Sequence, residues 1–104
     1  MVTTETEISK IKIFIKNCTA NGLKIDKVLL FGSVVIGTAT ENSDVDVMIF
    51  SYKFSDNFFD NVKLYSKSVR GFHNFDVKAY NTKKYYEGDL FIDEVKKDCL
   101  EISI

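Results

Sequence analysis

The chain has 104 residues, of which 45% are hydrophobic and 28% are charged, and its formal net charge is -1. This balance is typical of a globular protein and excludes the composition of a disordered chain. A near-neutral chain has no overall positive charge for nucleic-acid binding, although a local basic patch leaves a nucleic-acid partner open. The length indicates one domain, which we place over residues 1–104.

The cysteines and the N-terminus bear on the cellular compartment. Cys18 and Cys99 form neither a Cys-x-x-Cys pair nor a zinc-ligand spacing, so we expect two unpaired thiols in a reducing compartment. The polar N-terminus is unlike a signal peptide, and no apolar run approaches the roughly 20 residues that cross a bilayer. We therefore expect a cytoplasmic protein without a membrane partner.

Residues 4–20 are predicted to form the first helix. The segment from Thr4 to Glu7 fits the capping-box pattern that opens helices, and Asn21-Gly22 is a typical helix stop. Between these signals an apolar stripe recurs at helical spacing, with Phe14 on its flank. The stripe consists of Ile8, Ile11, Ile15 and Cys18.

The middle of the chain predicts two strands and a second long helix. The apolar run 28–31 is consistent with a buried strand, and residues 44–50 form the next strand, with turn residues between them. The helix is expected to begin at Ser55 or Asp56 and to end at Arg70-Gly71. Its expected inward positions are Phe58, Phe59, Val62, Tyr65 and Val69.

The C-terminal part predicts a strand, a helix and a short last strand. Residues 75–80 alternate between apolar and polar side chains, which is typical of a strand, and Asp89 can cap the helix that follows. The inner side of this helix is expected to carry Leu90, Phe91, Ile92 and Val95, and the last strand to present Leu100, Ile102 and Ile104 on one side.

Two aspartates open the second strand, at Asp44 and Asp46. Strand side chains alternate between faces, so both carboxylates point the same way and the valine between them points into the core. Neighbouring carboxylates repel each other, and a cation between them removes the repulsion. Hard oxygen ligands of this kind suit magnesium, which typically takes one or two carboxylates and substrate phosphates. The alternative is a solvated strand end without a ligand.

Gly32-Ser33 ends the first strand and precedes a short helical turn. Glycine lets the backbone approach a ligand closely, and backbone N–H groups at a helix start favour phosphate oxygens. The joint spacing of this turn and Asp44-x-Asp46 predicts a compact nucleoside-triphosphate site. Asp76 in the third strand is a third carboxylate for that site if the second and third strands are neighbours. An outward-facing aspartate is the alternative.

The segment "FGSVVIGTATENSDVDVMIF", residues 31–50, resembles the signature of the nucleotidyltransferase superfamily, the fold of DNA polymerase beta. The resemblance implies an α+β fold in which helices pack on one face of a small mixed β-sheet, in the order α-β-(short α)-β-α-β-α-β. It implies that Gly32 and Ser33 hold the triphosphate, that Asp44 and Asp46 bind two Mg²⁺ ions, and that Asp76 assists as a metal ligand or general base. The implied reaction transfers AMP, or another nucleoside monophosphate, from ATP or another NTP to an acceptor hydroxyl.

The short length and "FDVKAY" at residues 75–80 look most like the minimal nucleotidyltransferases, many of which are encoded beside a HEPN-domain toxin. The resemblance implies an antitoxin that attaches AMP to such a partner protein. The family turn often reads Gly-Ser-x-Ala-Arg-Gly, whereas Ile36 stands here in place of the arginine. Lys53, Lys78 and Arg70 are candidate cations to compensate.

Two other functions are consistent with the same residues. One is a nucleotidyltransferase-fold binding module that neutralises a partner by contact and transfers nothing. The other is a modifier of small molecules of the aminoglycoside type, which usually needs an additional acceptor domain. A homo-oligomer is also an open alternative, because a small domain with an uncovered sheet face can pair with itself.

Overall fold

The structure is a computed structural model and describes residues 3–104. Its elements are α1 Thr4–Ala20, β1 Lys27–Phe31, α2 Ser33–Ile36, β2 Val45–Phe50, α3 Phe58–Tyr65, β3 Phe75–Tyr80, α4 Thr82–Glu87, α5 Leu90–Lys97 and β4 Leu100–Glu101. The strands form one sheet in the order β3-β2-β1-β4, in which β1 is antiparallel to β2 and β4, and β2 is parallel to β3. This mixed sheet confirms the α+β class. No helix within residues 3–104 is long and apolar enough to span a bilayer.

Helix α1 has the predicted bounds, but its cap lies one residue earlier than expected. Thr3, and not Thr4, is the N-cap, and its Oγ1 accepts a hydrogen bond from the Thr6 N–H at 3.1 Å. Phe14, expected on the flank, is fully buried and makes edge-to-face contacts with two rings that precede or open β3. Ile11, Ile15 and Cys18 of the predicted stripe are buried, whereas Ile8 is only half-buried.

Helix α3 is shorter than predicted. It begins after the cap Asn57, whose side chain accepts from the Asp60 N–H, and it ends at Tyr65 instead of near Arg70. Phe58 and Phe59, expected to face inward, are 65% and 74% exposed. The helix stops where Ser66, Lys67 and Ser68 follow Tyr65, and the buried Ser68 carbonyl accepts a hydrogen bond from the Asn17 side chain on α1.

The C-terminal helices also differ from the prediction. Residues 82–87 form α4, a helix that the sequence pattern does not predict, and the Asn81 side chain caps it by accepting from the Lys83 N–H. Asp89 caps α5 as predicted, but Leu90 and Phe91 are 90% and 42% exposed rather than inward. The predicted last strand is reduced to β4, and Ile102 just beyond it is buried.

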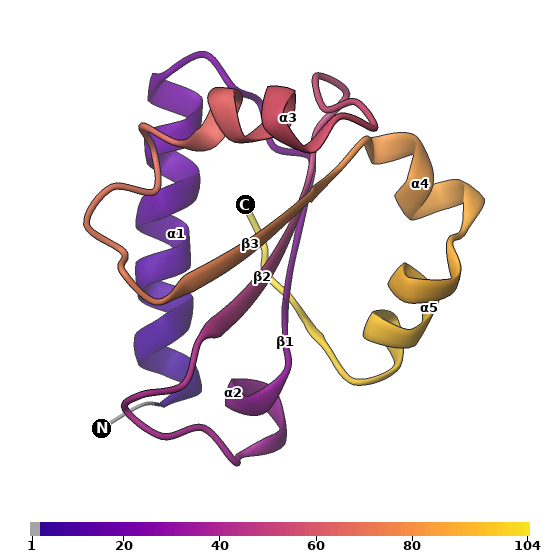
Figure 1. Cartoon of the computed structure of the whole chain (residues 1–104). Helices are drawn as coiled ribbons and strands as arrows, with labels where there is room; N and C mark the ends of the chain where they lie inside the picture. The colour runs from indigo at the N-terminus through magenta and orange to yellow at the C-terminus, as the bar shows by residue number, and fades with distance from the viewer. Residues whose placement is uncertain (1–2) are drawn as a thin grey trace.

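Helices cover both faces of the sheet, whereas we expected them on one face. Figure 1 shows α1 on one side of the sheet and α4 with α5 on the other. The α1 face holds the larger core, to which β2 contributes Val45, Val47 and Ile49. On the opposite face Met48 and Phe50 of β2 pack with Ile92 and Val95 of α5. Even-numbered residues of β2 thus face α5, and this is the face on which the acidic residues of β2 and β3 lie.

Candidate active site

The parallel pairing of β2 and β3 places two aspartates side by side. Asp46 and Asp76 are register partners in this pair, each at the second residue of its strand. The alternation of β2 puts Asp46 on the face of Met48 and Phe50, and β3 puts Asp76 on the same face. The condition set by the sequence, that the second and third strands be neighbours, is therefore met, and Asp76 lies beside Asp46.

The turn after β1 lies directly against the same carboxylate. Phe31, the last residue of β1, is the antiparallel partner of Asp46, so Gly32 comes next to the Asp46 side chain. A Cβ built on Gly32 would lie 2.1 Å from Asp46 Oδ2, and Gly32 has a φ of 78°. Both observations require glycine here, because a side chain would overlap the carboxylate and strain the backbone. Gly32 and Asp46 thus form one tightly packed unit.

Helix α2 follows Gly32 as a single turn. Gly32 is its N-cap and Ser33 its first residue, so the backbone N–H groups at its start have no intrahelical acceptors. The β-branched residues of α2 are weak helix formers, and the burial of Val34 holds the turn in place by tertiary packing. Ile36 is exposed at the end of α2, so no cation is presented from the position where the family motif carries arginine.

The Asp46 carboxyl has a raised pKa. Burial is the largest cause, followed by the negative charge of Asp76 and a hydrogen bond with its carboxyl group. Lys78 acts in the opposite direction, and its Nζ lies 3.6 Å from Asp76 Oδ2. The site therefore has more negative charge than its own cation offsets, which is the electrostatic condition that favours a bound divalent cation.

Asp44 takes a more distant place than the other two aspartates. It precedes β2, is exposed, and adds the smallest of the contributions that raise the Asp46 pKa. Within residues 3–104, no three His, Cys, Asp or Glu side chains converge closely enough to enclose a metal ion. The structure thus brings Asp46 and Asp76 together, and a set of three ligands that includes Asp44 stays a prediction.

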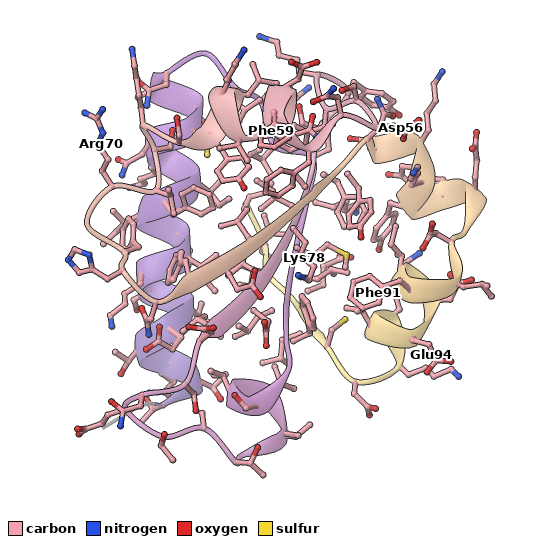
Figure 2. The ribbon with its side chains drawn as sticks, viewed as in Figure 1. Asp56, Phe59, Arg70, Lys78, Phe91 and Glu94 are labelled. Carbon is pink, nitrogen blue, oxygen red and sulfur yellow. The ribbon has the colours of Figure 1, made fainter. Side chains whose placement is uncertain are left out.

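Of the three candidate cations, Lys78 is at the site. Figure 2 shows Lys78 on the α5 side of the sheet. Arg70 lies on the loop beside α1 and points away from the sheet. Lys53 donates to the Gly22 carbonyl at 2.7 Å, at the other end of the sheet. Tyr65 of α3 lines the same pocket as Asp76 and Lys78, and burial followed by the negative charge of Asp76 raises its pKa. The helical pattern predicted the burial of Tyr65 but gave no sign of this proximity.

Two solved structures of other proteins have a fold similar to that of this chain. A candidate nucleotidyltransferase from Sulfolobus solfataricus superposes with a TM-score of 0.66 at 22% identity, covering 90% of this chain and 77% of the other. A toxin–antitoxin structure with AMP-PNP gives a TM-score of 0.62 at 18% identity, covering 88% and 71%. No curated protein matches the sequence. The family model of the nucleotidyltransferase domain matches residues 11–103, nearly the whole chain, and the chain therefore belongs to the nucleotidyltransferase domain family.

Proposed function

We propose that this nucleotidyltransferase-family protein moves AMP from ATP to a hydroxyl group on a partner protein, with Mg²⁺ as the cofactor. One observation carries the proposal: Asp46 and Asp76 are partners across parallel strands, and the backbone at Gly32 packs against the Asp46 carboxylate. Membership of the family supports an NTP substrate and a divalent metal in general. The AMP-PNP in the toxin–antitoxin neighbour supports an adenine nucleotide.

The carboxylates fit a divalent cation. Asp46 and Asp76 repel each other, which is one cause of the raised Asp46 pKa, and two carboxylates are a common protein contribution to Mg²⁺ sites. We assign Asp46 and Asp76 as the ligands, with Asp44 as a third. Held there, Mg²⁺ would supply positive charge to offset that of the phosphates.

The residues of the chain have separate roles in the transfer. The N–H groups at the start of α2, with the Ser33 hydroxyl, bind the phosphates beyond the α-phosphorus. The acceptor oxygen forms a bond to the α-phosphorus while the bond from that phosphorus to the bridging oxygen breaks, and pyrophosphate leaves. The proton of the acceptor hydroxyl passes to the Asp76 carboxylate, and Lys78, 3.6 Å from Asp76 Oδ2, holds that carboxylate in place.

The proposed acceptor is a HEPN-type toxin, which would make this chain the antitoxin of a pair. The solved structure of a toxin–antitoxin assembly with the same fold supports a protein acceptor over a small molecule.

The experiment is transfer of label from ATP carrying radioactive α-phosphate to the HEPN-type partner, with Mg²⁺ present. We expect Asp46→Asn to reduce labelling by about 10³-fold or more, because it removes a metal ligand and a charge from the reacting centre. Asp60→Asn, an exposed carboxylate on α3 away from the sheet face, is the matched control and should label like the wild type. Equal labelling by the two variants would contradict the proposal.

A second candidate function is neutralisation of the partner by contact alone. Exposed Ile36 in place of a cation and the ion pair between Lys78 and Asp76 favour it, since both reduce the positive charge that is available to phosphates. Under this function, Asp46→Asn should still neutralise the partner and no label should be transferred by either protein. Loss of neutralisation together with loss of label would rule it out.

A further inference from the structure

Strand β3 forms one edge of the sheet. Among residues 3–104 it is an outermost strand, and its one strand partner there is β2. The Val45 N–H donates to the Asn74 carbonyl and the Ser51 N–H donates to the Tyr80 carbonyl, so the even-numbered residues of this segment direct their backbone groups toward β2. The backbone groups of Val77 and Ala79 therefore point to the open side, where each offers an N–H donor and a carbonyl acceptor.

A groove of about 650 Å³ runs along this open edge. All six residues of β3 line it, and α3 and α4 form its walls through Phe58 and Lys84. Lys84 Nζ lies 3.1 Å from Asp56 Oδ1, and this ion pair links α4 to the segment before α3, near Tyr80. The charges along the groove are thus paired within the chain, and what it offers an occupant is backbone hydrogen bonds and an exposed aromatic ring.

The groove also reaches the candidate active site. Asp76 and Lys78 line it together with Tyr65. A strand added along β3 would place the side chain opposite Asp76 on the same sheet face, with Cβ atoms about 4.5–5.5 Å apart. A hydroxyl-bearing side chain at that position would lie beside the carboxylate that we propose as the base.

We infer that the open edge of β3 binds an extended segment of the acceptor protein as an added strand, with its acceptor hydroxyl next to Asp76. This inference rests on the proposed function, which it makes specific by naming how the acceptor docks. A single extended segment is the occupant because walls stand on both sides of the groove. A second copy of this chain would pair antiparallel through its own β3. Residues 66–74 of that copy, which precede its β3, would then have to fit between α3 and α4 of the first copy.

Two neighbouring phenylalanines provide a matched pair of variants. Phe58 and Phe59 are both largely exposed, at 65% and 74%, but only Phe58 lines the groove. The probe is a pool of peptides about eight residues long, rich in threonine and valine, each with one central tyrosine. Phe58→Ala should weaken peptide binding by about tenfold, because it removes an aromatic anchor, and Phe59→Ala should change it by less than about twofold.

Amide hydrogen exchange followed by NMR locates the bound peptide on the full chain. We expect saturating peptide to slow exchange at Val77 and Ala79, the residues whose N–H groups face the groove. Unchanged exchange at both residues, or equal weakening by Phe58→Ala and Phe59→Ala, would overturn the docking site. Slowed exchange that depends on protein concentration without peptide would overturn it in favour of a dimer through β3.

Label transfer from ATP to the same peptides separates this inference from the proposed function. Protection of Val77 and Ala79 without labelling supports the docking site and contradicts transfer. Labelling without protection, unaffected by Phe58→Ala, supports transfer and contradicts the docking site.

Discussion

The two faces of the sheet use the same strands for different purposes. On the α1 face, Val45, Val47 and Ile49 of β2 all belong to one continuous core with Phe14 at its centre. On the α5 face, Met48 and Phe50 are buried under α5, whereas Asp46 stays outside that cluster and partly exposed. One part of the α5 face thus packs against α5, and another part carries acidic residues. The core on the α1 face holds the strands that carry both parts.

This difference teaches where a small chain can place mutually repelling charges. A strand that is buried on both faces has no room for two such charges. The end of a strand that extends beyond the covering helix has room for them. The rigid apolar face fixes the backbone, and the backbone register then fixes the distance between Asp46 and Asp76. Four predictions would break or sharpen this comparison.

The largest effect is expected from Phe14→Ala on the α1 face. Phe14 is fully buried and contacts Phe72 and Phe75, so its removal leaves a cavity and should lower the free energy of unfolding by about 3–5 kcal/mol. On the α5 face, the Phe91 ring is 42% exposed, so Phe91→Ala should lower the free energy of unfolding by about 1 kcal/mol. Urea denaturation measures both, and equal losses would show that the two faces contribute alike.

Gly32→Ala tests the contact between the turn and the carboxylate. The added Cβ would overlap Asp46 Oδ2, and a displacement of about 1 Å at a reacting group reduces rates by about 10²-fold. Gly37→Ala is the control, since Gly37 has a similar φ of 83° but nothing within 4 Å of an added Cβ. Gly37→Ala should lose about 1 kcal/mol of stability from its positive φ, Gly32→Ala should lose more because of the added overlap, and only Gly32→Ala should lose transfer in the radiolabel assay.

Asp46→Asn should stabilise the folded chain at neutral pH. The raised Asp46 pKa means that the native state holds this proton more tightly than the unfolded state, where the pKa is 3.8. Stability from this group is therefore complete below pH 3.8 and is lost as pH rises through the folded value. Because Asp46 is only partly buried and water screens part of this effect, we expect the variant to melt slightly above the wild type at pH 7.

The same melting curves at lower pH provide the check on that prediction. The wild type and Asp46→Asn should converge as the carboxyl becomes protonated, and Mg²⁺ should raise the melting temperature of the wild type more than that of the variant. A difference that is constant with pH would show that the Asp46 charge is not its cause.

The smallest effect is expected from Tyr85→Phe, at the edge of the α5 face. The Tyr85 hydroxyl donates to Glu101 Oε1 at 2.5 Å, and this hydrogen bond is the main cause that raises the pKa of Tyr85 to about 12. Its loss should lower stability by about 0.5–1.5 kcal/mol below pH 10, while the ring keeps its contact with Lys96 Nζ at 3.9 Å. In an absorbance titration of Tyr85→Phe, the tyrosine that ionises at the highest pH should be missing. In Tyr86→Phe this ionisation should remain.

The sequence allowed the sheet and the active-site candidates to be predicted because their signals are local. The alternation in residues 75–80 and the apolar run before Gly32 determine which faces are buried, and the structure confirms both strands. The proximity of Asp46 and Asp76 depended on strand order, which no local pattern encodes. The nucleotidyltransferase signature provided that information by resemblance, and the contact of Gly32 with Asp46 required coordinates.

The helices were harder to predict because tertiary packing determines their ends. Helix α3 ends at Tyr65 although apolar spacing continues to Val69, since the backbone turns at Ser68 to bond with α1. Helix α4 has six residues and no apolar stripe of its own. Its position is set by contacts of Tyr85 with Phe50 and Lys96, which lie on other elements.

The close approach of Gly32 to Asp46 also selects the way in which β1 and β2 can assemble. A slip of one residue would turn every side chain of β1 to the wrong face. A slip of two residues would keep the faces but would press Leu30 or Val34 against the Asp46 carboxylate, where even a methyl group does not fit. Misaligned pairings of β1 and β2 are thus excluded by shape, and the glycine that makes room for the Asp46 carboxylate also fixes the register of the two strands.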